Sequence, residues 1–142
     1  MSTNKQKPDT THGAYTPNHA NAALNWFNSM CSKGKWNLTL NEQTKLLGEI
    51  ESQTFQNWKT QAQTGKRLEL HRNTLERLSL LLGIHNALNL IAPNGDKSIA
   101  YQWFNTPNEH PMFNGLSPKD FIIATGTIEA LHAVRRYLEA RH

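Results

Sequence analysis

Apolar residues recur at helical spacing in several separate segments of this chain. From Pro17 onward they follow i, i+3 and i+4 spacing, which predicts a helix with one face toward a core and an end at Gly34. A longer helix is predicted over 73–91. The positions expected to face the core are Ala22, Ala23, Trp26, Phe27 and Met30 in the first helix and Leu75, Leu78, Leu82, His85 and Leu88 in the long one.

Two shorter helices, over 40–47 and 53–63, are predicted from the signals at their ends. Thr39 and Glu42 form a capping box, in which the threonine hydroxyl accepts a backbone amide three residues on and the glutamate reaches back. Gly48 is expected to close the first of these helices. Ser52 is expected to cap the second.

The C-terminal third contains three more predicted helices, separated by turn residues. A helix over 97–104 follows a turn at 93–96, and the prolines and glycine of 106–116 predict a loop. Ser117 and Pro118 are expected to begin the next helix, and Thr127 to cap the last one. No stretch alternates with the period of a strand, so the fold is predicted to be all-α.

The chain has 142 residues, enough for one compact domain or two very small ones. Residues 1–16 are polar and are expected to form a flexible arm. No segment approaches the roughly 18 apolar residues of a membrane-spanning helix, and the N-terminus lacks the apolar stretch of a signal peptide. The single cysteine, Cys31, is interpreted as a small buried hydrophobe. We therefore expect a protein of the reducing cytoplasm, without membrane contact.

Charge is distributed unevenly, although the net charge is only +4. Residues 1–67 hold eight Lys/Arg and four Asp/Glu, whereas residues 68–142 hold seven of each, so the basic excess lies in the first half. A contact with a polyanion and a solvated lysine-rich face both agree with this asymmetry.

The two short helices with their connection have the layout of a helix-turn-helix. Five apolar residues are expected to lock the helices together: Leu46, Leu47, Ile50, Phe55 and Trp58. Amide and hydroxyl side chains then point outward and could read base edges, and basic residues follow that could contact phosphates. The candidate DNA-binding residues are Gln53, Thr54, Gln56, Asn57, Lys59, Thr60, Lys66 and Arg67. The alternative is a plain helical hairpin, which Glu49 and Glu51 favour because acidic side chains repel phosphate.

Residue patterns for catalysis are absent from the sequence. None of the seven histidines has a second His or Cys three or four residues away, as metal sites commonly require. There is no glycine-rich phosphate loop or nucleophile motif, and Glu76 and Glu129 each lack a carboxylate partner at close spacing. We therefore expect no catalytic residue, no metal and no cofactor, and an enzyme is the weakest hypothesis. His85 is interpreted as a core or interface histidine.

Many residues in order carry a family resemblance. The first half contains Leu46-Leu47-Gly48, then Thr54-Phe55-Gln56-Asn57-Trp58-Lys59, and a long helix from Leu75 to Leu88. The second half contains Trp103, Pro107-Asn108, Pro111, Phe113, Gly115, Ser117-Pro118, Gly126-Thr127, Leu131 and Val134-Arg135-Arg136-Tyr137-Leu138. Together these resemble the Xre/MbcA/ParS antitoxins, including their C-terminal toxin-binding domain.

The resemblance implies an antitoxin of a type II toxin–antitoxin pair. Such proteins neutralise a RES-domain toxin, which consumes NAD, by covering its active site; they form homodimers, and many repress their own operon by binding operator DNA. The implied organisation is an arm over 1–16, a helical domain with the helix-turn-helix over 17–92, and a toxin-binding domain over 93–142. The implied toxin-binding residues are Trp103, Asn108, Phe113, Arg135, Arg136, Tyr137 and Arg141.

A second hypothesis is a stand-alone helix-turn-helix regulator without a toxin partner. It would use the same two short helices, while Tyr137 and Leu138 would pack into the protein's own core and the arginines would stay solvated. Trp103, Pro107, Pro111 and Phe113 would then only shape a loop.

Overall fold

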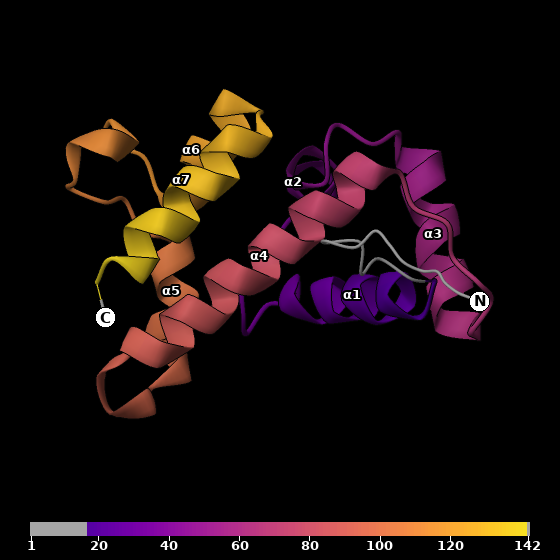
Figure 1. The fold of residues 1–142 in the computed structure, drawn as a ribbon, viewed down its shortest axis with the longest axis horizontal. Coiled ribbons are helices and arrows are strands. Elements are labelled where there is room, and N and C mark those ends of the chain that lie inside the picture. The colour runs from indigo at the N-terminus through magenta and orange to yellow at the C-terminus, as the bar shows by residue number, and fades with distance from the viewer. Residues whose placement is uncertain (1–16, 142) are drawn as a thin grey trace, which may run out of the picture.

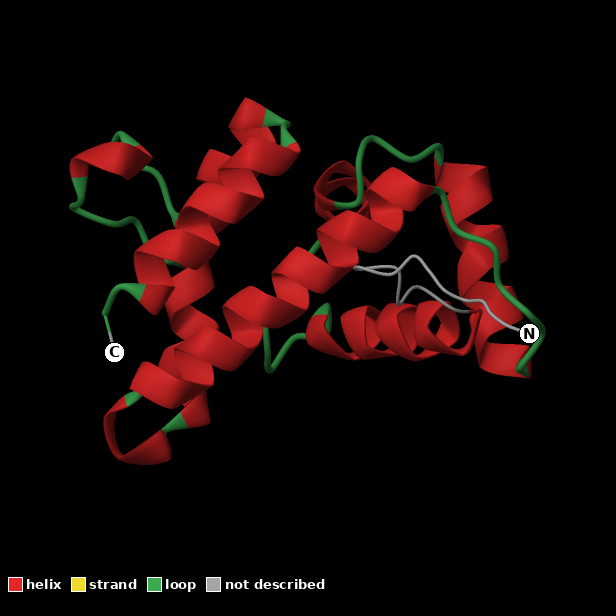
Figure 2. Cartoon of the chain, in the orientation of Figure 1, coloured by secondary structure: helices red, strands yellow, loops and turns green. Residues whose placement is uncertain are grey.

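The computed structural model describes residues 17–141, and this part of the chain consists of helices and loops without a strand (Figure 2). The predicted all-α fold is confirmed. In chain order the helices are α1 (Pro17–Met30), α2 (Leu40–Leu46), α3 (Ser52–Thr64), α4 (Arg72–Ile91), the short 3-10 turn η1 (Pro93–Gly95), α5 (Lys97–Asn105), η2 (Pro111–Phe113), α6 (Pro118–Thr125) and α7 (Ile128–Glu139). The arm predicted over 1–16 lies outside the described residues.

Local hydrogen bonds explain where most helices begin. Thr39 and Glu42 form the predicted capping box, with bonds of 3.1 and 3.0 Å. Ser117 and Thr127 cap α6 and α7 as predicted. The cap predicted at Ser52 is wrong: that residue is already helical, and the preceding Glu51 is the N-cap without a side-chain bond.

Helix α4 crosses the middle of the molecule, with α1, α2 and α3 on one side and α5, α6 and α7 on the other (Figure 1). It packs most extensively against α7 and also against α1 and α5. The buried apolar side chains of both sides belong to one continuous core. The domain boundary predicted between residues 92 and 93 therefore lies between two parts of the chain that both pack against α4 and share one core.

This packing overturns the single apolar stripe predicted for the long helix. Leu81 and Ile84, which the stripe omits, are fully buried, whereas Leu82 is 37% exposed and His85 only half-buried. The reason is that α4 has neighbours on several faces, so its buried residues cover more than one stripe. In α1 the prediction was also partly wrong: Ala22 is exposed, and the core face is formed by Ala20, Leu24, Phe27 and Met30.

Trp36, in the loop after α1, joins the two sides of the molecule. Its ring is fully buried and stacks on Phe104 of α5 with 4.2 Å between centroids. Asn105, the next residue of α5, donates from Nδ2 to the Trp36 carbonyl at 2.7 Å. An ion pair adds a second link, since Lys119 Nζ of α6 lies 2.8 Å from Glu42 Oε2 of α2. None of the helices within residues 17–141 has the length and hydropathy to cross a membrane.

Glu42 makes stability depend on pH in a predictable direction. Burial raises the pKa of its carboxyl, but hydrogen bonds from Lys119 and the Thr39 backbone outweigh this, and the net pKa lies below 4.5. Because the carboxyl has a lower pKa in the folded than in the unfolded protein, its ionised form stabilises the fold at pH values above the unfolded pKa. This stabilisation is lost as the pH falls below 4.5 and passes through the pKa of the folded protein.

Glu42→Gln removes the charge and keeps a side chain that can complete the capping box. We expect it to lower the free energy of unfolding by about 0.5–1 kcal/mol at pH 7, a difference that vanishes in acid. Urea unfolding at pH 7, 5, 4 and 3 measures this, with Glu109→Gln, an exposed carboxylate outside any ion pair in residues 17–141, as control. A pH-independent difference contradicts the assignment.

Candidate functional site

Helices α2 and α3 and the turn between them form the first candidate surface. Leu46, Leu47, Phe55 and Trp58 are buried and hold the two helices together, as predicted. Gly48 makes the turn possible because its φ of +108° is a conformation that glycine adopts readily. Thr74 of α4, fully buried, donates to the Leu47 carbonyl at 3.1 Å and fastens the turn to the core.

The outer face of α3 carries the polar side chains predicted there. Gln53, Gln56, Asn57 and Thr60 are exposed, and Thr54 is half-buried. Gln53 Nε2 donates to Asn57 Oδ1 at 3.1 Å, so the two amides already have a fixed orientation. This face therefore presents hydrogen-bonding groups on a rigid helix.

Basic residues flank this face. Lys59 lies with its ammonium 5.3 Å from the centre of the Phe55 ring, and Lys66 and Arg67 are exposed in the loop that follows α3. That loop is held by Asn21 of α1, which donates to the Lys66 carbonyl at 2.8 Å and accepts from the Leu68 amide at 3.2 Å. Sequence reasoning missed Asn21, because nothing local connects it to a loop 45 residues away.

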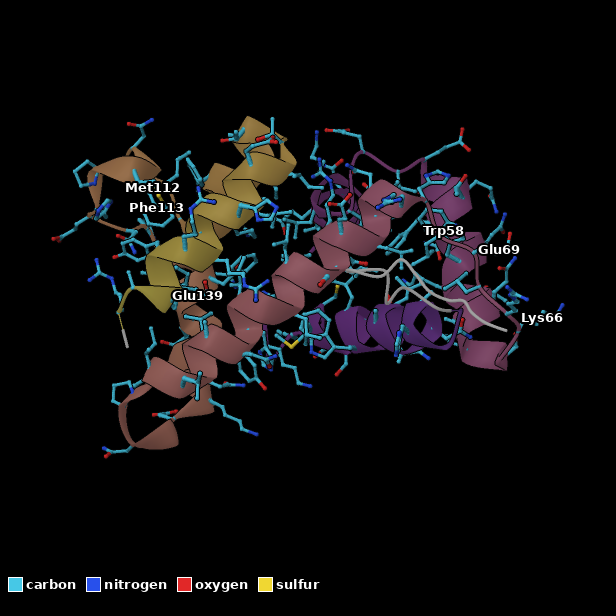
Figure 3. All side chains as sticks on the ribbon, in the orientation of Figure 1. Trp58, Lys66, Glu69, Met112, Phe113 and Glu139 are labelled. Atoms are coloured by element: carbon cyan, nitrogen blue, oxygen red, sulfur yellow. The ribbon has the colours of Figure 1, made fainter. Side chains whose placement is uncertain are left out.

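A polar hollow of about 410 Å³ lies between α3 and this loop. Its lining includes Asn57, Trp58, Arg67 and Glu69. Figure 3 shows Trp58, Lys66 and Glu69 at one end of the molecule and Met112, Phe113 and Glu139 at the other. The two sets of predicted site residues therefore lie on two separate surfaces.

The loop over 106–116 forms part of the second candidate surface. The Asn108 amide donates to the Leu116 carbonyl at 3.1 Å and closes the loop at its base. Inside it, Asn108 Oδ1 accepts from the His110 amide at 2.8 Å, and His110 Nδ1 accepts from the Met112 amide at 3.1 Å. These bonds give the loop a defined shape and place Asn108 as a residue that builds it.

Aromatic side chains from α5, this loop and α7 meet in one cluster, which we call the aromatic cluster: Trp103, His110, Phe113 and Tyr137. The Tyr137 ring stacks on Trp103 at 6.2 Å and meets His110 at 5.0 Å and Phe113 at 5.4 Å, edge to face. Such ring pairs contribute about 0.5–1.5 kcal/mol each beyond the area they bury. The place of His110 in this cluster was missed in the sequence because its partner Tyr137 is distant along the chain.

Phe113, one of the predicted toxin-binding residues, lies beneath the other rings of the aromatic cluster. The side chain is 0% exposed and also packs against Phe121 of α6 at 5.4 Å. In this conformation it offers a partner no surface, and it supports the half-buried rings of Trp103 and Tyr137 from below. The alternative interpretation, a residue that shapes the loop, describes its position.

The three arginines predicted to contact a toxin have distinct surroundings. Arg135 pairs with Glu139 at 2.9 Å, and its guanidinium lies so close to Gly83 of α4 that a Cβ there would be 3.0 Å away. Arg141 lies over the Tyr137 ring, 4.2 Å from its centre. The Arg136 side chain is exposed and has no hydrogen bond or ion pair with residues 17–141. Arg136 is thus the arginine that can bind a partner without first breaking a contact.

Two further titratable groups, Cys31 and His85, are half-buried and are not among the predicted site residues. Burial raises the pKa of the Cys31 thiol to about 12, although the charge of Lys59 acts in the opposite direction. Burial also lowers the pKa of His85, which lies among the rings of Trp26, Trp36 and Tyr101. The interpretations of Cys31 as a small hydrophobe and of His85 as a core histidine agree with these positions.

Comparison with known proteins identifies the second surface. Residues 87–142 match the family described as antitoxin Xre/MbcA/ParS C-terminal toxin-binding domain. An uncharacterized protein of Sinorhizobium fredii, y4oB, is 34% identical over 107 residues, which span 75% of this chain and 75% of that protein. The match contains the end of α4 (87–91), α5, the loop over 106–116, α6 and α7. The chain belongs to the Xre/MbcA/ParS family of antitoxins, and the aromatic cluster and the α7 arginines lie in its toxin-binding domain.

Proposed function

We propose that this antitoxin neutralises a RES-domain, NAD-consuming toxin by covering its active site with α7 and the loop over 106–116. The observation that carries the proposal is the surface formed by the aromatic cluster with Arg136 and Arg141 beside it. Trp103 and Tyr137 are held by ring contacts before any partner arrives, so binding need not immobilise them. Aromatic and arginine side chains are also the residues that most often dominate the energy of protein interfaces.

Arg136 has the clearest role on this surface. An exposed guanidinium can bind a carboxylate of the toxin through two parallel hydrogen bonds. Arg141 keeps the outer face of Tyr137 covered and would contact the toxin with it. Arg135 is placed to support the surface, because Glu139 and the close approach to Gly83 hold it against α4.

We further propose that α3 binds operator DNA, so that the antitoxin represses its own operon in the cytoplasm. The exposed amides of Gln56 and Asn57 suit adenine in the major groove. Lys66 and Arg67, fixed by Asn21, are placed for phosphates. Glu49 and Glu51 oppose this contact, although Lys45 lies 3.4 Å from Glu49 and offsets part of its charge. The alternative, a regulator that acts on DNA without a toxin, would use this surface alone.

A homodimer is the third part of the proposal, and its interface is the groove between α1 and α4. The groove has a volume of about 420 Å³ and an almost wholly apolar lining that includes Ala22, Ala23, Trp26, Leu75, Ser79 and Leu82. Helix α1 and residues 78–91 contain no Asp, Glu, Lys or Arg, and His19 of α1 also lines the groove. A surface helix normally carries charges on its solvent face, and two identical faces meet without repulsion only when like charges are absent. Leu82 of each copy could enter the space above the small residues of the other.

The toxin contact predicts that Arg136→Glu abolishes neutralisation. Reversing the charge at a buried interface pair costs several kcal/mol, which corresponds to a loss of binding of at least about a hundredfold. Growth and cellular NAD are measured in cells that express the RES-domain toxin together with each antitoxin variant. Arg72→Glu, an exposed arginine on α4 outside the toxin-binding domain, is the matched control and should still neutralise. Full neutralisation by Arg136→Glu and also by Tyr137→Ala would refute the proposed surface.

The DNA contact predicts different changes for bases and phosphates. Gln56→Ala should weaken binding to the operator by about 1–3 kcal/mol in free energy and reduce the preference of the protein for the operator over unrelated DNA. Lys66→Ala should weaken binding to every sequence and reduce the slope of log K against log salt by about 0.9. Fluorescence anisotropy with the duplex upstream of the antitoxin gene measures both, with Lys97→Ala on α5 as control. Equal affinity and slope in all variants contradicts DNA binding through α3.

The dimer predicts that Leu82→Glu produces monomers. Leu82→Glu would bury an unpaired carboxylate of each copy in the apolar groove of the other, whereas Leu90→Glu places a charge on the same helix at a residue that is 72% exposed and outside the groove. Sedimentation equilibrium at micromolar concentration should show dimers for the natural chain and Leu90→Glu and monomers for Leu82→Glu. Circular dichroism verifies that each variant is folded. A dimeric Leu82→Glu variant would exclude this groove as the interface.

A further inference from the structure

Arg77 of α4 is a buried arginine that lies between the two candidate surfaces. The residue is 6% exposed, and it is absent from the ion pairs found within residues 17–141. Its Nε donates to Asn73 Oδ1 at 2.7 Å, and one terminal nitrogen donates to the Gly126 carbonyl at 3.0 Å. Removing a guanidinium from water is costly, so these two hydrogen bonds fix where it can lie.

On one side, Arg77 touches the turn between α2 and α3. A Cβ at Gly48 would lie 2.9 Å from Asn73 Oδ1 and 3.3 Å from Arg77 Nε. The turn backbone therefore rests directly against the Asn73–Arg77 hydrogen bond. Since Gly48 also needs its positive φ, the turn cannot move toward α4 without displacing the guanidinium.

On the other side, Arg77 holds the connection between α6 and α7. Gly126 is the C-cap of α6, and Thr127 directly after it caps α7. A guanidinium at a helix C-terminus is also favoured by the helix dipole. The charges of Glu129, at the start of α7, and of Glu49, in the turn between α2 and α3, both act on Arg77.

We propose that Arg77 is a positioning residue that couples the turn at Gly48 to the α6–α7 connection. A displacement of α7 on the toxin side then alters the turn that precedes α3. This inference rests on the proposed function for its biological meaning, namely a toxin-dependent change in operator binding. The planar guanidinium presents donors in a fixed fork and can hold two acceptors at once. An apolar residue of similar length could fill this space without linking the two turns. Buried ionic groups often contribute less stability than such replacements.

Amide hydrogen exchange on the full chain, without toxin or DNA, tests the coupling. Thr127→Ala removes the bond that the Ala130 amide donates to the Thr127 hydroxyl and loosens the start of α7. The coupling predicts exchange about two- to fivefold faster at the Gly48 and Ile50 amides, which are hydrogen-bonded in the other turn. In an Arg77→Met background the same Thr127→Ala change should leave the Gly48 and Ile50 amides unaffected.

A merely structural role for Arg77 gives a different pattern. Arg77→Met would then speed exchange only in its own surroundings. Thr127→Ala would have the same effect at Gly48 and Ile50 in the natural chain and in the Arg77→Met background, or no effect in either. Either of these two results overturns the proposal. Arg72→Met, at the exposed start of α4, is the matched control and should retain the coupling. If Arg77→Met does not fold, Arg77→Lys, which keeps the charge and lacks the fork, takes its place with the same expectation. Neither toxin nor DNA is present, so failure here is distinguishable from failure of the proposed function.

Discussion

The burial of α4 on several faces is the constraint on which the rest of this structure depends. Leu81 and Ile84 are fully buried, and α4 packs against α1, α5 and α7. Fully burying a leucine or isoleucine side chain stabilises a fold by about 1.5–3 kcal/mol, so the residues along this helix hold both sides of the molecule to one core. The two candidate surfaces consequently occupy opposite ends of one rigid helical scaffold, and neither is an independent module with its own core.

This arrangement would let a small antitoxin serve both of the proposed partners, a toxin and operator DNA. The toxin-binding domain presents a rigid aromatic surface with an exposed arginine, whereas α3 presents amides with basic residues beside them. A toxin bound over α7, as proposed, would leave the outer face of α3 open. Arg77 and the ion pair between Glu42 and Lys119 are polar links between the two sides. Because hydrogen bonds and ion pairs depend on distance and direction, such links fix the orientation of the two sides relative to each other more strictly than apolar packing does.

Most features set by near neighbours in the sequence could be predicted, apart from the cap expected at Ser52, whereas features set by distant residues could not. The capping box at Thr39 depends on residues three apart, and the outward face of α3 follows from helical periodicity; both are confirmed. The stripe on α4 was wrong because burial there depends on helices from both ends of the chain. The sequence could not decide whether Phe113 contacts a partner or shapes the loop, because an aromatic residue between turn residues has the same local pattern whether a distant α7 covers it or not. The contact between Gly83 and Arg135 joins residues 52 apart, which no local pattern reveals.

Hydroxyl-radical footprinting of the antitoxin with and without its toxin tests the central claim, namely that α7 and the loop over 106–116 form the toxin-binding surface. Three readily oxidised side chains, Trp103, Met112 and Tyr137, lie half-buried on this surface, and Trp26 and His71 provide references elsewhere. We expect the toxin to lower the oxidation rates of Trp103, Met112 and Tyr137 severalfold and to leave those of Trp26 and His71 unchanged. Protection confined to residues outside the toxin-binding domain, with these three unprotected, would contradict the claim.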